Sequence, residues 1–411
     1  MAPTVEQSVN ATGLAPVTVP VPLFTPAEPA VFAKKRAAAR AALATTTVPS
    51  DKKYTNWLRM KVAERFEGRA IGGAAPEFTI DQPDYDTGIK TIAIPLAKAI
   101  KDWPAEVAPY LMGDVLPPAA HYFSALSGST YMDGVVVVIP KDTKVAVTAD
   151  FSAEPGKLNG YRTIIVVNEG ANATFLERNK PHRKAKGGTV VSHGVEVYVK
   201  PGATFSYYGL QQWPEDVSYF PAYRAVVEAG ASMDWLIGSF GASLSQPWIE
   251  SALAGEGAET NVRAVYYGTD AQHLDQTLTA NHLVGHTSSD TYARGIVTDT
   301  AKAVYRGMIK IQRGAHGSSA DQNGHGMLLT NTAHIDSIPG LEIDADDVTA
   351  GHGATVGQVD DEQLFYLMAR GLSRDQARDM IIHGFFEDLF KRITSESIRS
   401  EFWRAVEAKR S

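Results

Sequence analysis

Short apolar runs bounded by turn-forming residues fill the middle of the chain. From about Gly134 onward, Val- and Ile-rich segments end at Gly, Pro, Asn or Asp, a pattern that is typical of β-strands. These segments are VVVVIP (135–140), KVAVTA (144–149), RTIIVV (162–167), GVEVYV (194–199) and YRAVVE (223–228). The pattern predicts a central region that consists mainly of strands.

A Gly-Ala turn recurs between these strands. The pairs begin at positions 170, 202, 230 and 257, at intervals of 32, 28 and 27 residues, and alternating residues follow each pair. A solenoid of β-coils with variable loops would produce such spacing. A β-sandwich also contains short strands and turns, but about two hundred residues would be large for one. No six-residue period indicates a hexapeptide helix. We therefore favour a parallel β-helix.

Helices are predicted before this region. Thr25-Pro26-Ala27-Glu28 has the form of a capping box with proline at the first helical position, which predicts a helix to Leu43. A second helix is expected from about Ser50 to Glu67, where Gly68 ends it. Several prolines over 95–126 predict short, broken helices.

Helices are also predicted after the strands. Asp360 or Asp361 can cap a helix that Gly371 ends in a left-handed conformation. Ser373-Arg374-Asp375-Gln376 forms a second capping box, and Thr394 or Ser395 starts a last helix that runs to about Ala408. The predicted organisation is a flexible tail (1–24), an N-terminal helical domain (25–125), a β-helix core (126–357) and a C-terminal helical domain (358–411).

The amino-acid composition excludes several classes of function. With 44% hydrophobic residues the chain can bury a core, and its net charge of −7 argues against a nucleic-acid partner. It contains no cysteine, which excludes disulfides, thiolate nucleophiles and cluster ligation through its own thiolates. The residues before the first lysine, Lys34, do not have the pattern of a targeting peptide, and no stretch is apolar enough to span a bilayer. We expect a cytoplasmic protein without a membrane partner.

Local motifs for catalysis are absent from the sequence. No HExxH, phosphate-binding loop or G-x-S-x-G motif occurs. His316, His325 and His334 are nine residues apart, a spacing that no single helix or strand brings to one face. Taken alone, these observations predict a nonenzymatic β-rich protein with helical ends.

One long segment resembles a known family. Residues 341–371, LEIDADDVTAGHGATVGQVDDEQLFYLMARG, resemble the signature of the SufB/SufD iron–sulfur cluster assembly scaffolds. In that family LEI-x-A-D-D-V leads into C-S-H-G-A-T-x-G and F-Y-L-x-S-R-G. The segments 304–339 and 123–140 extend the similarity, so that it covers about two thirds of the chain. The H-G-A-T-V-G form is similar to the SufD branch.

The resemblance implies a right-handed parallel β-helix between two helical domains. It also implies a noncatalytic scaffold subunit that pairs with a SufB-like paralogue and docks the SufC ATPase. The run from Ala303 to Val348 is expected to supply strands that pair with SufB. The chain alone is expected to bind no cofactor, while an iron–sulfur cluster or iron can be held transiently at the interface with SufB.

The sequence departs from the family at two places. Ala350-Gly351-His352 replaces C-S-H, so only His352 can inherit a metal-ligating role at the cluster-forming interface. Gln322-Asn323-Gly324-His325 replaces an arginine-bearing Q-N-R segment.

The resemblance assigns ATPase binding to the C-terminal helices. Ile381, Phe385 and Leu389 share one face of the helix that follows Ser373, which predicts that Phe386 and Phe390 are exposed on another. Aromatic side chains of this kind are typical binding hot spots. The alternative is that the final helix (395–408) covers them and that they complete a small core. The expected partner-binding residues are Phe385, Phe386, Leu389 and Phe390.

The alternative from a different class is a carbohydrate-active β-helix enzyme of the pectate-lyase type. Such enzymes are generally exported and line a groove with acidic and basic residues. Residues 1–30, which are not expected to form a signal peptide, and the predicted helical C-terminus both argue against this alternative.

Overall fold

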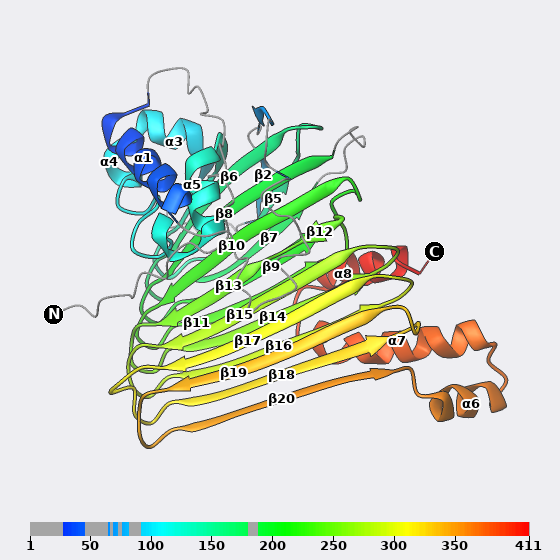
Figure 1. The fold of residues 1–411 in the computed structure, drawn as a ribbon. Coiled ribbons are helices and arrows are strands. Elements are labelled where there is room, and N and C mark those ends of the chain that lie inside the picture. The colour runs from blue at the N-terminus through cyan, green and yellow to red at the C-terminus, as the bar shows by residue number, and fades with distance from the viewer. Residues whose placement is uncertain are drawn as a thin grey trace.

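The computed structural model describes residues 28–45, 65, 69–72, 76–81, 92–179 and 188–410. The predicted tail (1–24) and, apart from residue 65, the predicted helix at 50–67 lie outside these residues. Two sheets make up most of the described chain (Figure 1).

The strands divide between an eleven-stranded sheet, here sheet A, and a nine-stranded sheet, here sheet B. Sheet A contains β1 (Ile71–Gly72), β3 (Ile92–Pro95), β4 (Asp133–Ile139), β6 (Leu158–Val167), β8 (Thr189–Val199), β10 (Val217–Val227), β12 (Leu244–Ser245), β13 (Trp248–Leu253), β15 (His273–His282), β17 (Lys302–Ile311) and β19 (His334–Ile343). Sheet B contains β2 (Glu77–Asp81), β5 (Lys144–Phe151), β7 (Asn172–Asn179), β9 (Thr204–Gln211), β11 (Ser232–Ser239), β14 (Glu259–Gly268), β16 (Ser288–Val297), β18 (Ser319–Leu328) and β20 (Thr349–Gln358).

From β4 onward the chain passes back and forth between the two sheets. The pairs β2–β5 and β3–β4 are antiparallel, and every other strand pair of the described chain is parallel. Successive strands therefore form the coils of a β-solenoid with about eight turns. This confirms the predicted parallel β-helix, because a sandwich would pair its strands in antiparallel fashion.

The Gly-Ala turns mark the coils of the solenoid. Asn172 pairs with Thr204, Thr204 with Ser232 and Ser232 with Glu259, so the register along sheet B follows the same intervals of 32, 28 and 27 residues. The glycine before each of these strands has φ between +62° and +74°, a left-handed conformation that glycine adopts without steric cost. The turn therefore recurs where each coil enters sheet B.

The core lies between the two sheets, and the number of covered faces decides the burial pattern of each strand. On β5 buried and partly buried residues alternate, as expected for one covered face. On β6 every residue is buried, because the N-terminal helices cover its outer face. The sequence RTIIVV reflects this double burial.

The N-terminal helices pack on the outer face of sheet A (Figure 1). They are α1 (Ala30–Thr45), α3 (Leu96–Asp102), α4 (Pro104–Val107), the 3-10 helix η2 (Pro118–Ala120) and α5 (Tyr122–Thr130). The broken helices over 95–126 are confirmed, and the predicted helix up to Leu43 is confirmed from Ala30 onward. Its predicted start at the 25–28 capping box is wrong, because Glu28 and Pro29 are not helical and the Glu28 carboxylate pairs with Arg36. Among the described residues, no helix is both long and apolar enough to cross a membrane.

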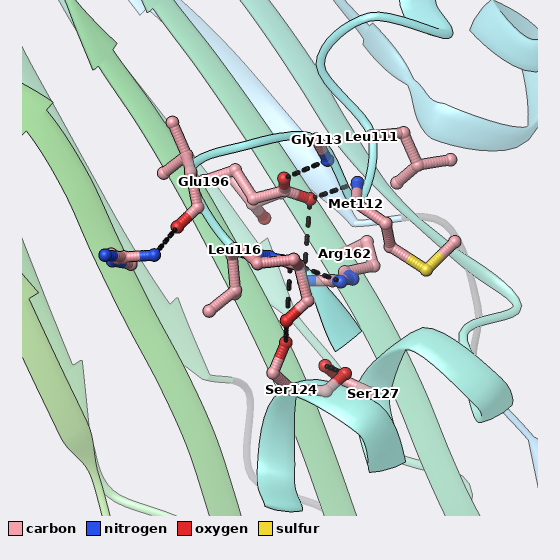
Figure 2. A network of polar contacts seen from close by, with 12 residues as sticks. Leu111, Met112, Gly113, Leu116, Ser124, Ser127, Arg162 and Glu196 are labelled. Carbon is pink, nitrogen blue, oxygen red and sulfur yellow. Dashed lines mark hydrogen bonds and ion pairs between the residues drawn. The ribbon is translucent and has the colours of Figure 1, made fainter. Parts of the chain in front are cut away.

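A buried ion pair attaches this helical region to sheet A. The Arg162 Nη1 and Glu196 Oε1 atoms lie 3.5 Å apart, and both side chains are fully buried (Figure 2). Glu196 accepts hydrogen bonds from the backbone N–H groups of Met112 and Gly113, at 2.8 and 3.2 Å, and Arg162 donates to the Leu116 carbonyl. The loop between α4 and η2 is thus held against β6 and β8 by charge-assisted hydrogen bonds.

The C-terminal helices begin and end where the capping signals predict. They are α6 (Asp361–Ala369), α7 (Arg374–Phe390) and α8 (Glu396–Ala408). Asp360 caps α6, Ser395 caps α8, and Ser373 with Gln376 forms a complete capping box on α7. Gly371 adopts φ of +96° directly after α6, and the N–H groups of Gly371 and Leu372 bond back to the last turn of α6.

Candidate functional site

Both sheets end at the same end of the solenoid, at the lower edge of Figure 1. Strand β19 is the last strand of sheet A and β20 is the last strand of sheet B. Within the described part of the chain, each has one neighbour and one free edge. A free edge presents unpaired N–H and C=O groups that can pair with another chain.

The position of these edges narrows one prediction, which stays untested. The run 303–348 was expected to supply the pairing strands, but β17 and β18 lie in this run and are paired on both sides. Of that run only β19 has a free edge, and β20, which follows it, has the other. The parallel coil order decides this, because the last coil always leaves the edges.

Large apolar side chains are exposed at this open end. Ile338 on β19 is 45% exposed and Val356 on β20 is 40% exposed, and Ile343 is exposed to a similar degree. Large apolar residues next to free strand edges are unusual in an uncovered sheet, since natural edges are normally protected by charge or by a covering element. The open end therefore has the chemistry of an interaction surface.

His352 lies on β20, with its side chain on the inner side of the solenoid. Residues alternate along the strand, and Ala350 packs against the interior residues Ile309 and Ala320, so His352 lies on the same face. Gly351 and Gly353 occupy the opposite face. His352 is nevertheless exposed, because no further coil follows to cover it.

The two segments that depart from the family pattern are neighbours in sheet B. Gln322 on β18 is the register partner of His352, and the pairing continues from Asn323 opposite Gly353 to His325 opposite Thr355. Gln322 is fully buried, and its Nε2 donates to the Gly340 carbonyl at 3.1 Å. The sequence separation of 30 residues concealed this contact.

In the described part of the chain, the open end offers isolated imidazoles to a metal and no cluster of ligands. Among the described residues, no group of three or more His, Asp or Glu side chains is arranged to hold a metal ion. His316 contacts the Asp346 carbonyl, His325 contacts Thr355 and His334 contacts Asp336, so these three histidines serve separate local contacts. Neutral imidazole is a competent iron ligand, but further ligands at His352 would have to come from another chain.

The prediction that Phe386 and Phe390 are exposed is wrong. Both rings are fully buried and stack 5.7 Å apart in a cluster that joins α7 and α8 to the outer face of sheet B. Leu389 is buried in the same cluster, and Phe385 is only partly buried beside Arg294. These rings complete a core, and Phe386 and Phe390 offer no surface to a partner.

The rotation of α7 explains this error. Two apolar rows run along the helix at a spacing of four residues, and sheet B covers the row with Ile382, Phe386 and Phe390. Ile381 and Phe385 lie on the adjacent row and are partly exposed. Both rows have the same apolar character in sequence, so periodicity alone could not choose between them.

Exposed aromatic residues of the C-terminal helices lie on α6. Phe365 is 74% exposed and Tyr366 is 58% exposed, and Met368 adds further apolar surface. Leu364 is the one buried residue of this helix. Phe365 and Tyr366 border a surface pocket with Asp361, Glu362 and Ala369. The first two residues of the F-Y-L motif are therefore on the surface, and the predicted set of partner-binding residues did not include them.

The known proteins compared by sequence are all described as iron–sulfur cluster assembly proteins. The SUF system FeS cluster assembly, SufBD core domain family matches residues 151–385. The chain is 31% identical over 285 residues to the iron–sulfur cluster assembly protein SufB of Bacillus subtilis, which covers 69% of this chain and 61% of that protein. It is 34% identical over 236 residues to an iron–sulfur cluster assembly SufBD family protein of Mycobacterium leprae, which covers 57% of this chain and 27% of that protein.

The aligned region thus spans less than two thirds of the length of either relative. The family match covers the coils from β6 to β20 together with α6 and most of α7, the part that carries the open end and His352. It gives no support to the carbohydrate-active alternative. From the coil architecture and the length of the match, we conclude that this chain belongs to the SufBD family of the SUF iron–sulfur cluster assembly system.

Proposed function

We propose that this chain is a noncatalytic, SufD-like scaffold subunit of the SUF system that pairs with a SufB-like paralogue and docks a SufC-like ATPase. The observation that carries this proposal is the open end of the solenoid. There, two free strand edges, exposed Ile338 and Val356, and His352 occupy one surface.

Composition favours the SufD-like role over the SufB-like role. The chain contains no cysteine, so it cannot carry a persulfide or ligate a cluster through a thiolate. Sulfur transfer would therefore belong to the partner. What this subunit adds to a shared site is the His352 imidazole, and Ala350 occupies the place where the family pattern has cysteine.

Strand addition is the mode of pairing that the geometry favours. A partner with two free edges of its own can extend sheets A and B by backbone hydrogen bonding and cover Ile338, Ile343 and Val356. The same contact would bring His352 to the interface. Iron or an iron–sulfur cluster is then a cargo held between the two chains, with this chain supplying one ligand.

The ATPase contact is proposed on α6. Phe365, Tyr366 and Met368 offer exposed apolar area next to Asp361 and Glu362. Aromatic residues in such a position are efficient anchors, since a partner gains by removing them from water. This replaces Phe386 and Phe390 as the proposed contact, because both are core residues.

Co-expression tests the proposal directly. The full chain is produced together with a Cys-containing SufBD paralogue and an ABC-type ATPase of the same system, and purified through a tag on this chain. We expect a stable complex that contains all three proteins. A chain that remains monomeric at micromolar concentration in the presence of the paralogue would contradict the proposed role.

A further inference from the structure

Five buried oxygen atoms inside the last turns of the solenoid have no hydrogen-bond partner among the described residues. They are Gln276 Oε1, Thr291 Oγ1, Tyr305 Oη, Gln322 Oε1 and Ser337 Oγ. Each comes from a different strand, in order β15, β16, β17, β18 and β19. Buried polar groups are almost always paired in native proteins, so five in one neighbourhood require a physical explanation.

The five residues form two rows that face the interior. On sheet A, Gln276 pairs in register with Tyr305, and Tyr305 pairs with Ser337. On sheet B, Thr291 pairs with Gln322, and Gln322 pairs with His352. Each row therefore runs along the axis of the solenoid, and the row on sheet B leads to the open end at His352.

Two glycines bring the rows together. A Cβ atom added at Gly307 would meet Tyr305 Oη and would lie 2.6 Å from Gln322 Oε1, although these oxygens belong to opposite sheets. A Cβ atom added at Gly324 would lie 2.8 Å from Ser337 Oγ. The Tyr305 side chain and the Gln322 and Ser337 oxygens thus occupy the room that these two glycines leave, which gathers three of the unpaired oxygens around the Tyr305 ring.

The chemistry of this lining selects the ligand. Three hydroxyl groups and two amide oxygens carry no net charge, so the lining can both donate and accept hydrogen bonds but cannot neutralise an ion. The amide nitrogens of Gln276 and Gln322 already donate to Ser239 and to the Gly340 carbonyl, so that the two amide oxygens are the groups still without a partner among the described residues. A water molecule satisfies such a set, since buried waters typically make about three hydrogen bonds to protein.

We propose that the last turns of the solenoid enclose an internal water site, formed by Gln276, Thr291, Tyr305, Gln322 and Ser337, that continues to His352. The last step of this inference rests on the proposed function. Once a partner covers the open end, the water in this site is the solvent that remains beside the interface histidine. The site would keep a covered cluster-forming interface hydrated from inside the scaffold.

The experiment compares two buried threonines in the full-length chain. Thr291→Val removes a hydroxyl that has no protein partner. Thr260→Val is the matched control, because Thr260 is equally buried but its hydroxyl contacts Ser251 and the Met233 carbonyl, at 2.8 and 3.0 Å. The readouts are ordered water in a high-resolution crystal structure, long-lived internal waters counted by magnetic relaxation dispersion in solution, and the Tm.

We expect ordered waters on at least three of the five oxygens in the unaltered chain. Thr291→Val should lose one internal water without a rise in Tm, whereas Thr260→Val should lower the Tm and leave the water count unchanged. A dry interior, with a higher Tm for Thr291→Val because an unpaired hydroxyl is removed, would overturn the inference. These measurements need no partner, so failure of the proposed pairing and failure of the water site are distinguishable.

Discussion

Gln322 and His352 are register partners on β18 and β20, and both side chains lie on the inner side of the solenoid. Gln322 is fully buried, whereas His352 belongs to the uncovered last coil and is exposed. The pair therefore marks the boundary between the core and the open end. It also lies where the two segments in which this chain departs from the family pattern pair with each other, although the changed residues Ala350, Gly351 and Gly324 are not register partners of one another.

Replacement of His352 tests its proposed role as an interface ligand. His352→Ala should leave folding and complex formation unchanged, because the side chain is exposed and belongs to no described metal group. It should lower the amount of iron–sulfur cluster formed on the assembled complex, measured by absorbance and iron content at equal complex concentration.

A second exposed histidine at the same end provides the control. His334 lies at the start of β19, and its contact is with Asp336. His334→Ala should give the same cluster yield as the unaltered chain. Equal yields for both variants would assign His352 to a purely structural position.

Charges at the free edges should prevent pairing with the SufB-like paralogue. Ile338→Lys combined with Val356→Lys places two desolvated charges in the proposed interface, and lysine is a residue that protects natural edges from pairing. We expect at least a tenfold weaker Kd, equivalent to about 1.4 kcal/mol, measured by titration calorimetry.

Leu283→Lys is the matched control for this pair. Leu283 is also about 40% exposed, but it follows β15 in a turn between coils, away from the free edges. The control should bind normally, and all variants should keep the Tm of the unaltered chain. Undiminished binding by the double variant would place the paralogue contact on another surface.

Removal of the exposed rings of α6 should weaken ATPase binding. Phe365→Ala combined with Tyr366→Ala should cost about 2 kcal/mol of binding free energy, since both rings are available for burial by a partner. Because neither ring is in the core, the Tm and the pairing with the SufB-like paralogue should be unchanged.

Phe386→Ala serves to distinguish the loss of a contact with the ATPase from a loss of folding stability. This ring is fully buried between α7, α8 and sheet B, so its truncation should lower the free energy of unfolding by about 3–5 kcal/mol in chemical denaturation. If Phe386→Ala were neutral for stability, or if the α6 double variant bound the ATPase normally, the assignment of surface and core in this helical unit would be wrong.

His282 makes a defined contribution to the pH dependence of stability. Its ring is buried, with Thr287 Oγ1 2.8 Å from Nδ1 and Ser289 Oγ 2.9 Å from Nε2, and burial lowers its pKa to about 4. The unfolded chain takes up a proton near pH 6.5. Between pH 6.5 and 4 the unfolded state therefore binds more protons at this residue, and the native state loses stability as the pH falls.

Comparison with His282→Gln separates the contribution of His282 to the pH dependence of stability from the contributions of other titrating groups. The stability difference between the unaltered chain and the variant should shrink by about 2 kcal/mol from pH 8 to pH 5, measured by urea denaturation at each pH. A difference that stays constant over this range would mean that His282 titrates alike in both states.

Local signals in the sequence determined the elements and the repeat. The spacing of the Gly-Ala turns at 170, 202, 230 and 257 equals the number of residues in each coil. The reason is that each coil needs a left-handed residue at the same point. Ser373 with Gln376 likewise defines the start of α7 through contacts three residues apart. Signals of this kind act within one turn of chain, so they survive without tertiary context.

Tertiary packing decided which faces and edges are used. The two apolar rows of α7 are equivalent in sequence, and packing against sheet B and α8 buries Phe386 and leaves Phe385 partly exposed. The neighbours of His352 come from coils 30 residues away, and its exposure follows from being on the last coil. Such properties depend on long-range register and on what covers each surface, and neither is encoded in the spacing of nearby residues.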